Sequence, residues 1–216
     1  MRSTEGKCGE MKVPAFSLAN GLDIPAVGLR MDQVRDPREA AAAVQHALEF
    51  GYRSIDTASA YGNERDVGRG IRASGVPRED IFVSTKVDGP DHGYERTLYG
   101  FESMLKRFGF EYIDMYLIHW PGKYLCPETW RALERLYADG RVKAIGVCNF
   151  NVRHLERLRD SCSVVPMVDQ IEWHPYFQQG VVGEYCSDAG ILVEAWSRLM
   201  CGGVALEDAV IVAISR

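Results

Sequence analysis

Met115-Tyr116-Leu117-Ile118 is the stretch that decides the fold, together with Ala144-Ile145-Gly146-Val147 further along the chain. Both stretches are continuous apolar runs without alternating polar residues. A strand with one solvent-exposed face alternates apolar and polar residues. A strand of a parallel sheet is buried on both faces and is therefore a continuous apolar run. The two stretches therefore predict central strands of a parallel α/β sheet.

Outward from these two strands, an alternation of strand and helix covers most of the chain. Successive strands are expected to begin about 24–31 residues apart. A regular βα repeat of this length predicts a parallel α/β sheet, either doubly wound or closed into a barrel, and the spacing alone does not choose between them. Strands are expected at 26–29 and from near Ser54, Ile81, Tyr112, Val142, Met167 and Ile191. Further helices are expected at 63–74, 94–108, 127–139, 152–160 and 179–189.

Two local signals place the first elements. Asn20-Gly21 stands between alternating apolar residues, which predicts a hairpin over 16–24 with a type I′ turn. Asp36 followed by Pro37 predicts the start of a helix, because the aspartate accepts hydrogen bonds from free N–H groups and proline fits the first turn. We expect this helix to end at Gly51.

The composition is that of an ordinary soluble domain. The chain has 216 residues, 46% apolar and 25% charged, which suits one domain over residues 13–216 after a polar extension at 1–12. Its 25 basic and 30 acidic side chains give a net charge of −5, which argues against nucleic-acid binding. No apolar run approaches the ~20 residues that cross a membrane. The N-terminus lacks a signal-peptide core and the six cysteines are scattered, so we expect a cytoplasmic protein with reduced thiols.

Polar residues follow the apolar runs at the points where strands are expected to end. In both α/β architectures the reactive groups lie at these carboxyl ends. One further polar residue, Tyr61, lies in the loop after the second strand. The residues at the strand ends are Asp56, Lys86, His119, Asn149, Gln170 and Trp196.

Four of these side chains suit acid–base chemistry at a carbonyl group. A Lys ammonium beside a Tyr hydroxyl stabilises the phenolate and lowers the tyrosine pKa from about 10. If Asp56 pairs with Lys86 and holds it in place, Tyr61 becomes a general acid or base for a carbonyl or an alcohol. A neutral His119 beside it would donate a hydrogen bond that orients the carbonyl.

Other chemistries find less support in the sequence. No G-x-G-x-x-G follows a strand, and no Walker loop or G-x-S-x-G elbow occurs, so a cofactor would bind by another scheme. A metal-dependent hydrolase with Asp56, His119, Glu172 and His174 as ligands is an alternative, although neither H-x-H nor H-E-x-x-H is present. We therefore expect no metal site.

Several longer motifs run through the chain in a fixed order. They are Gly51-Tyr-Arg-Ser-Ile-Asp56-Thr-Ala58 with Tyr61-Gly62-Asn63-Glu64, then Leu117-Ile-His119-Trp120-Pro121, Ala144-Ile-Gly-Val-Cys148-Asn149-Phe150 and Asp169-Gln170-Ile-Glu172-Trp-His174-Pro175. This series resembles the aldo-keto reductase family, and within it the prostaglandin F synthase and diketogluconate reductase-like branch. The resemblance covers about 13–199. It implies a (β/α)8 TIM barrel that reduces aldehydes or ketones to alcohols by hydride transfer from NADPH.

The resemblance also implies roles for single residues. Tyr61 would be the proton donor, tuned by Lys86 and Asp56, and His119 would orient the carbonyl of a small-molecule substrate. Trp120 would line the substrate pocket beside His119. The residues implied at the cofactor are Asn149 and Gln170 at the nicotinamide carboxamide, Trp196 stacked on the nicotinamide ring, and Ser197 and Leu199 near the pyrophosphate.

The chain departs from the family pattern around the expected pocket. Gly28-Leu29-Arg30-Met31-Asp32 stands where the family usually shows Gly-Leu-Gly-Thr-Trp, and Val87-Asp88-Gly89 replaces Leu-Trp-Asn. Cys148 and Asp169 stand where the family has Ser and Asn, and Ser197-Arg198-Leu199-Met200 replaces Ser-Pro-Leu-Gly. The pocket is therefore expected to be more polar and more open than in typical members.

The end of the chain is a further departure. The sequence stops after the seventh expected strand and a tail from Cys201 to Arg216, so the eighth βα unit and the segment that binds the adenosine 2′-phosphate are expected to be missing. NADH therefore remains an alternative to NADPH. A truncated, catalytically weak binding or regulatory protein is the alternative to an active reductase.

Overall fold

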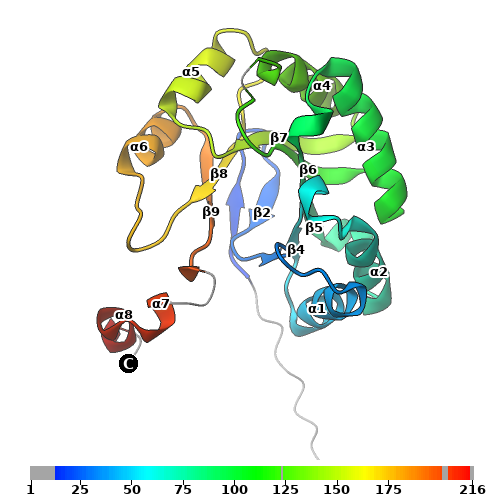
Figure 1. Cartoon of the computed structure of the whole chain (residues 1–216), viewed down its shortest axis with the longest axis vertical. Helices are drawn as coiled ribbons and strands as arrows, with labels where there is room; N and C mark the ends of the chain where they lie inside the picture. Colours follow the sequence, from blue (N-terminus) through cyan, green and yellow to red (C-terminus); the bar gives the residue numbers. More distant parts are fainter. Residues whose placement is uncertain (1–12, 123, 201–203, 215–216) are drawn as a thin grey trace, which may run out of the picture.

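An open, curled sheet forms the framework of the protein. A computed structural model describes residues 13–122, 124–200 and 204–214. Seven parallel strands lie side by side in chain order across the sheet (Figure 1). The predicted α/β class and the seven predicted strands are confirmed. The strands are β3 (Leu29–Arg30), β4 (Ser54–Asp56), β5 (Phe82–Val87), β6 (Ile113–Ile118), β7 (Val142–Cys148), β8 (Val168–Glu172) and β9 (Leu192–Trp196).

Helices connect successive strands and cover the outer face of the curled sheet (Figure 1). The predicted helices are confirmed, with small shifts at their ends. In the part of the chain that the structure describes, no helix is long and apolar enough to cross a membrane. The connecting helices are α1 (Pro37–Phe50), α2 (Glu64–Ser74), α3 (Tyr94–Phe108), α4 (Cys126–Ala138), α5 (Val152–Arg159) and α6 (Gly180–Asp188).

The core lies between the sheet and these helices. Every residue of β6 and every residue of β7 except Lys143 is buried, as the continuous apolar runs in these two strands predict. Helix α1 begins with Asp36 accepting from the N–H groups of the first turn, and it turns one face inward through Ala40, Val44 and Leu48. Their four-residue spacing places them on one side of the helix. Burial of a Val or Leu side chain stabilises the fold by ~1.5–3 kcal/mol.

The N-terminal hairpin is present, but its turn differs from the prediction. A type I′ turn needs positive φ at both central residues, and in this loop only Gly21 has one, at 82°. Gly21 N–H donates to the Leu18 carbonyl at 2.8 Å, which makes the loop a turn closed by a left-handed glycine. The reason lies in the loop length, because Leu18 N–H donates to the Leu22 carbonyl at 2.8 Å and this pair encloses three residues instead of two. The Asn20 amide donates to the Lys143 carbonyl at 2.9 Å and ties the hairpin to β7. The hairpin strands are β1 (Ala15–Ser17) and β2 (Asp23–Pro25).

Strands β3 and β9 are the two edges of the sheet. Within the described residues no eighth strand lies between them, so the sheet is an open part of the barrel that the resemblance implies. The expected extension at 1–12 lies outside the described residues. Beyond β9 the expected tail contains two short helices, which stand away from the sheet (Figure 1). These helices are α7 (Val204–Glu207) and α8 (Ala209–Ile214).

Candidate active site

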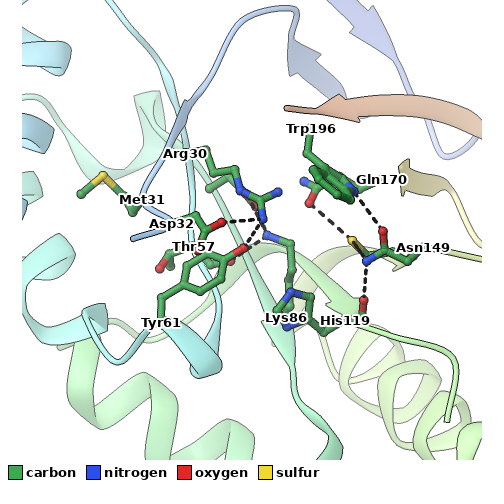
Figure 2. A network of polar contacts seen from close by, with 12 residues as sticks. Arg30, Met31, Asp32, Thr57, Tyr61, Lys86, His119, Asn149, Gln170 and Trp196 are labelled. Atoms are coloured by element: carbon green, nitrogen blue, oxygen red, sulfur yellow. Dashed lines mark hydrogen bonds and ion pairs between the residues drawn. The ribbon is translucent and has the colours of Figure 1, made fainter. Parts of the chain in front are cut away.

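The four predicted acid–base residues meet at the carboxyl ends of neighbouring strands. Figure 2 shows three of them, Tyr61, Lys86 and His119. Asp56 ends β4, and Tyr61 ends the short 3-10 helix η1 (Ser59–Tyr61) that follows it. Lys86 lies one residue before the end of β5, and His119 directly follows β6. Parallel neighbours in register place these residues at one edge of the sheet, so side chains distant in sequence come into contact.

Asp56 and Lys86 form a buried ion pair. Lys86 Nζ lies 2.6 Å from Asp56 Oδ1 and 2.7 Å from Oδ2, and it donates to the Thr57 carbonyl at 2.9 Å. The Ser84 hydroxyl donates to Asp56 Oδ1 at 2.8 Å. The predicted pairing of Asp56 with Lys86 is thus present. Because an ammonium carries three protons, these acceptors use all of them and leave none for Tyr61.

Tyr61 is bonded to a different cation from the one predicted. Lys86 Nζ lies 5.5 Å from the centroid of the Tyr61 ring, whereas Arg30 Nη2 donates to Tyr61 Oη at 2.5 Å. Burial raises the pKa of Tyr61, and the Arg30 charge offsets part of that rise. The prediction that Lys86 lowers the Tyr61 pKa is therefore wrong, and the hydroxyl carries its proton at neutral pH.

His119 is neutral at neutral pH, as predicted. Burial and, after it, the Lys86 charge lower the pKa of His119 to about 4. Its ring lies edge-on to the Tyr61 ring, with centroids 5.8 Å apart. Nδ1 lies 3.6 Å from Asp88 Oδ1, which is too long for a hydrogen bond. The two rings therefore stand side by side as an uncharged pair of polar groups.

A second group of polar side chains comes from the next three strands, with Asn149 directly after β7, Gln170 within β8 and Trp196 at the end of β9 (Figure 2). Trp196 Nε1 donates to Asn149 Oδ1 at 3.0 Å, and Asn149 Nδ2 donates to the His119 carbonyl at 3.0 Å. The Cys148 thiol lies 3.6 Å from Gln170 Oε1. Asn149 adopts a φ of 64°, a left-handed conformation that asparagine tolerates better than most residues. The amides of Asn149 and Gln170 are thus held beside Trp196.

Two residues without a predicted role occupy the centre of this arrangement. The Arg30 guanidinium lies between Tyr61 and Trp196, with Cζ 5.5 Å and 5.4 Å from their ring centroids (Figure 2). Glu194 has a buried Oε2 without a partner among the described residues. Burial, followed by the Asp56 charge, raises the pKa of Glu194. The sequence marks Arg30 only as a departure from a family pattern, and it carries no signal for Glu194.

A cavity of about 130 Å³ lies across the opening between β3 and β9, and its lining includes Arg30, Asp56 and Trp196 but not Tyr61, Lys86 or His119. It combines charged and polar groups with apolar side chains from the N-terminal hairpin and β9. Its polar lining comes from Arg30, Ser54, Asp56, Gln170, Glu194 and Arg198. Its apolar lining includes Phe16, Ile24, Leu192 and Trp196.

The remaining predicted site residues, Trp120, Ser197 and Leu199, come shortly after the ends of β6 and β9. Trp120 is 56% exposed, and its ring centroid lies 6.5 Å from that of His119. Leu199 is 58% exposed beyond the end of β9. Ser197 adopts a φ of 57°, which marks a sharp turn directly after Trp196. The Trp120 and Leu199 side chains are therefore more exposed to solvent than the groups at the strand ends.

The alternative metal ligands are not gathered into one group. His174 Nε2 lies 3.2 Å from Glu172 Oε1, so these two pair with each other beyond β8. Asp56 is engaged by Lys86 instead. Among the described residues, no group of three or more His, Cys, Asp or Glu side chains is arranged to hold a metal ion.

Comparison with known proteins identifies the family. The Aldo/keto reductase family matches residues 28–208, which is most of the chain. The chain belongs to this family. An aldo-keto reductase from Brucella melitensis shares its fold, with a TM-score of 0.89 and 47% sequence identity over 94% of this chain and 78% of that one. The Bombyx mori aldo-keto reductase in complex with NADP has a TM-score of 0.81 and 34% identity over 87% of this chain and 67% of that one.

A named relative of this aldo-keto reductase is the glyoxal reductase of Bacillus subtilis (strain 168). The two are 51% identical over 185 residues, which make up 86% of this chain and 67% of the relative. The chain thus spans about two thirds of the length of that aldo-keto reductase.

Proposed function

We propose that this aldo-keto reductase reduces aldehydes or ketones to alcohols by hydride transfer from NADPH. The observation that carries the proposal is the meeting of Asp56, Tyr61, Lys86 and His119 at one end of the sheet. A buried ion pair beside a protonated tyrosine and a neutral histidine suits proton delivery to a carbonyl oxygen.

Tyr61 is the proton donor in this proposal. Its hydroxyl accepts a hydrogen bond from Arg30, which leaves its own proton free to donate to a substrate carbonyl. The neutral His119 ring stands beside it and donates a second hydrogen bond to the same oxygen. The Arg30 guanidinium that donates to the tyrosine oxygen stabilises negative charge there as the proton leaves, and the Asp56–Lys86 pair lies beside the Tyr61 ring.

The residues at β7, β8 and β9 fit a nicotinamide cofactor. The amides of Asn149 and Gln170 offer donors and acceptors for a carboxamide, and the Trp196 indole offers a stacking face. The cofactor, when bound, supplies the hydride. NADPH is favoured because the Bombyx mori structure holds NADP. NADH is the second candidate, and Ser197 and Leu199 are the residues proposed near the pyrophosphate.

A binding or regulatory role with weak catalysis is the second candidate function. The observation that favours it is the Arg30 guanidinium, which lies over the Trp196 ring proposed to stack on the nicotinamide. A cofactor must displace this side chain in order to bind. A chain that binds NADPH but turns over no carbonyl substrate would support this second role.

The experiment that separates the two functions is steady-state NADPH oxidation by wild type and Tyr61→Phe. Glyoxal is a suitable first substrate because a named relative reduces it. Loss of the proton donor is expected to lower kcat/KM by about 10²–10⁴-fold while NADPH binding is retained. Tyr99→Phe is the matched control, because Tyr99 is 76% exposed. Equal turnover by wild type and Tyr61→Phe would remove Tyr61 from this role.

A further inference from the structure

Arg30 is the feature of the site that the proposed function does not explain. It is the last residue of β3, and its guanidinium lies between the Tyr61 hydroxyl and the face of Trp196 (Figure 2). Its Nη1 is buried and has no hydrogen-bond partner among the described residues. The family pattern usually has a glycine at this position, so Arg30 is a departure from that pattern.

We propose that Arg30 makes the nicotinamide site select the reduced cofactor over the oxidised one. The inference rests on the proposed function, because it takes the nicotinamide to stack on Trp196. The reduced ring is neutral and the oxidised ring carries a positive charge. A guanidinium held beside the ring attracts the electron-rich neutral form and repels the cationic form.

The positive charge of Arg30 is only partly compensated by its neighbours. Asp32 Oδ2 lies 3.4 Å from Arg30 Nη2, and this side chain is 39% exposed to solvent, which weakens the pair. Asp56 is already neutralised by Lys86 at 2.6 Å. Glu194 faces the same cavity, and burial raises its pKa, which reduces the negative charge it contributes. A net positive potential therefore remains in the cavity.

Displacement of Arg30 affects both cofactor forms equally. Either form must move the guanidinium off the Trp196 face, while its bond to Tyr61 keeps it beside the ring, and the two rings have nearly the same size. The cost of moving it therefore cancels in the ratio of the two dissociation constants, and the ratio reports the charge alone. Two unit charges about 5 Å apart near a protein surface interact strongly enough to change this ratio by about 10- to 100-fold.

The test is titration calorimetry of the 216-residue chain with NADPH and with NADP⁺. The variants are Arg30→Met, which keeps a long side chain without the charge, and Arg30→Lys, which keeps the charge. The ratio Kd(NADP⁺)/Kd(NADPH) is expected to fall by about tenfold or more in Arg30→Met and to stay near the wild-type value in Arg30→Lys. Arg135→Met on the exposed surface of α4 is the matched control and should leave the ratio unchanged.

The outcomes separate the inference from the proposed function. If both cofactor forms bind and the ratio is the same in wild type and Arg30→Met, Arg30 does not select the redox state, and the proposed function stands. If neither form binds to folded wild type or to folded Arg30→Met, the proposed function fails and this inference fails with it. Circular dichroism of each variant establishes that the chain is folded.

Discussion

At the scale of single residues, the buried carboxyl group of Asp169 makes the stability of the protein depend on pH. Its side chain is fully buried, Oδ1 accepts from Phe150 N–H at 3.4 Å, and Oδ2 has no partner among the described residues. Burial raises the pKa of Asp169 to about 8, whereas an aspartate in an unfolded chain titrates near 4. Between these values the unfolded chain has lost the proton that the folded chain retains. The free energy of unfolding therefore decreases as pH rises from about 4 to about 8.

Asp169→Asn removes this ionisation and keeps the acceptor for Phe150. We expect the free energy of unfolding at pH 7 to increase by about 1–3 kcal/mol, and the increase to vanish near pH 4, where the unfolded aspartate is also protonated. Urea denaturation of both proteins at several pH values measures the difference. Asp160→Asn, at an exposed position, is the control. The same increase at every pH would show that ionisation of Asp169 is not its cause.

The pH dependence of catalysis follows from the neutral state of His119. Its pKa of about 4 means that it remains uncharged well below the pH at which an exposed histidine is protonated. We expect kcat/KM to fall on the acid side with an apparent pKa near 4. Asp88→Asn removes a nearby negative charge that raises the His119 pKa, so it should shift the acid limb of the kcat/KM pH profile to lower pH. A wild-type limb near pH 6.5 would contradict the prediction.

The partners of the site residues show what sequence can and cannot predict at this scale. The pairing of Lys86 with Asp56 follows from their positions at the ends of neighbouring strands, because parallel register brings such residues together. The bond from Arg30 to Tyr61 spans 31 positions and depends on the path of a long side chain across an opening in the sheet. No local pattern in the sequence records that path, and the same is true of Glu194.

At the scale of elements, helices α1 and α2 approach closely at Gly70. A Cβ atom at this position would lie 2.5 Å from the Ala41 carbonyl oxygen and 2.8 Å from Val44 Cβ. Gly70→Ala therefore forces the two helices apart, and we expect the free energy of unfolding to decrease by about 1–3 kcal/mol. Chemical denaturation measures the change.

Gly180→Ala is the matched control for this helix contact. Gly180 is the first residue of α6, and a Cβ atom there would meet nothing within 4 Å. Alanine has the higher helix propensity, so we expect the free energy of unfolding to stay the same or to rise by up to about 1 kcal/mol. Equal losses in Gly70→Ala and Gly180→Ala would mean that helix contact does not explain the Gly70 effect.

Element positions are predicted well where the signal is local. The start of α1 follows from Asp36, whose side chain accepts from the N–H groups of Arg38 and Glu39. The hairpin turn is predicted wrongly because Leu18 pairs with Leu22 and encloses three residues, a loop that needs a positive φ only at Gly21. A turn type read from the Asn-Gly pair alone does not include the backbone pairing that sets the loop length.

At the scale of the whole molecule, the order of the strands follows from the βα repeat. The repeat does not tell whether the backbone groups at the two sheet edges are paired. Leu192 N–H donates to the Met167 carbonyl, and the Trp196 carbonyl accepts from Trp173 N–H. In a parallel ladder alternate residues direct both backbone groups to the same neighbour. The backbone groups of Val193 and Ala195 therefore point away from β8, toward the open edge of β9.

An unpaired edge of this kind favours pairing with a strand of another molecule. We expect the chain to associate as its concentration rises, and sedimentation velocity measures this. Ala195→Pro removes an outward N–H without touching the β8–β9 ladder, and Val193→Lys adds a charge at the same edge. Each variant should weaken association by about tenfold or more while circular dichroism stays unchanged. A wild-type chain that is monomeric at every concentration, or association that neither variant weakens, would mean that β9 is already shielded by β3 and the hairpin across the cavity.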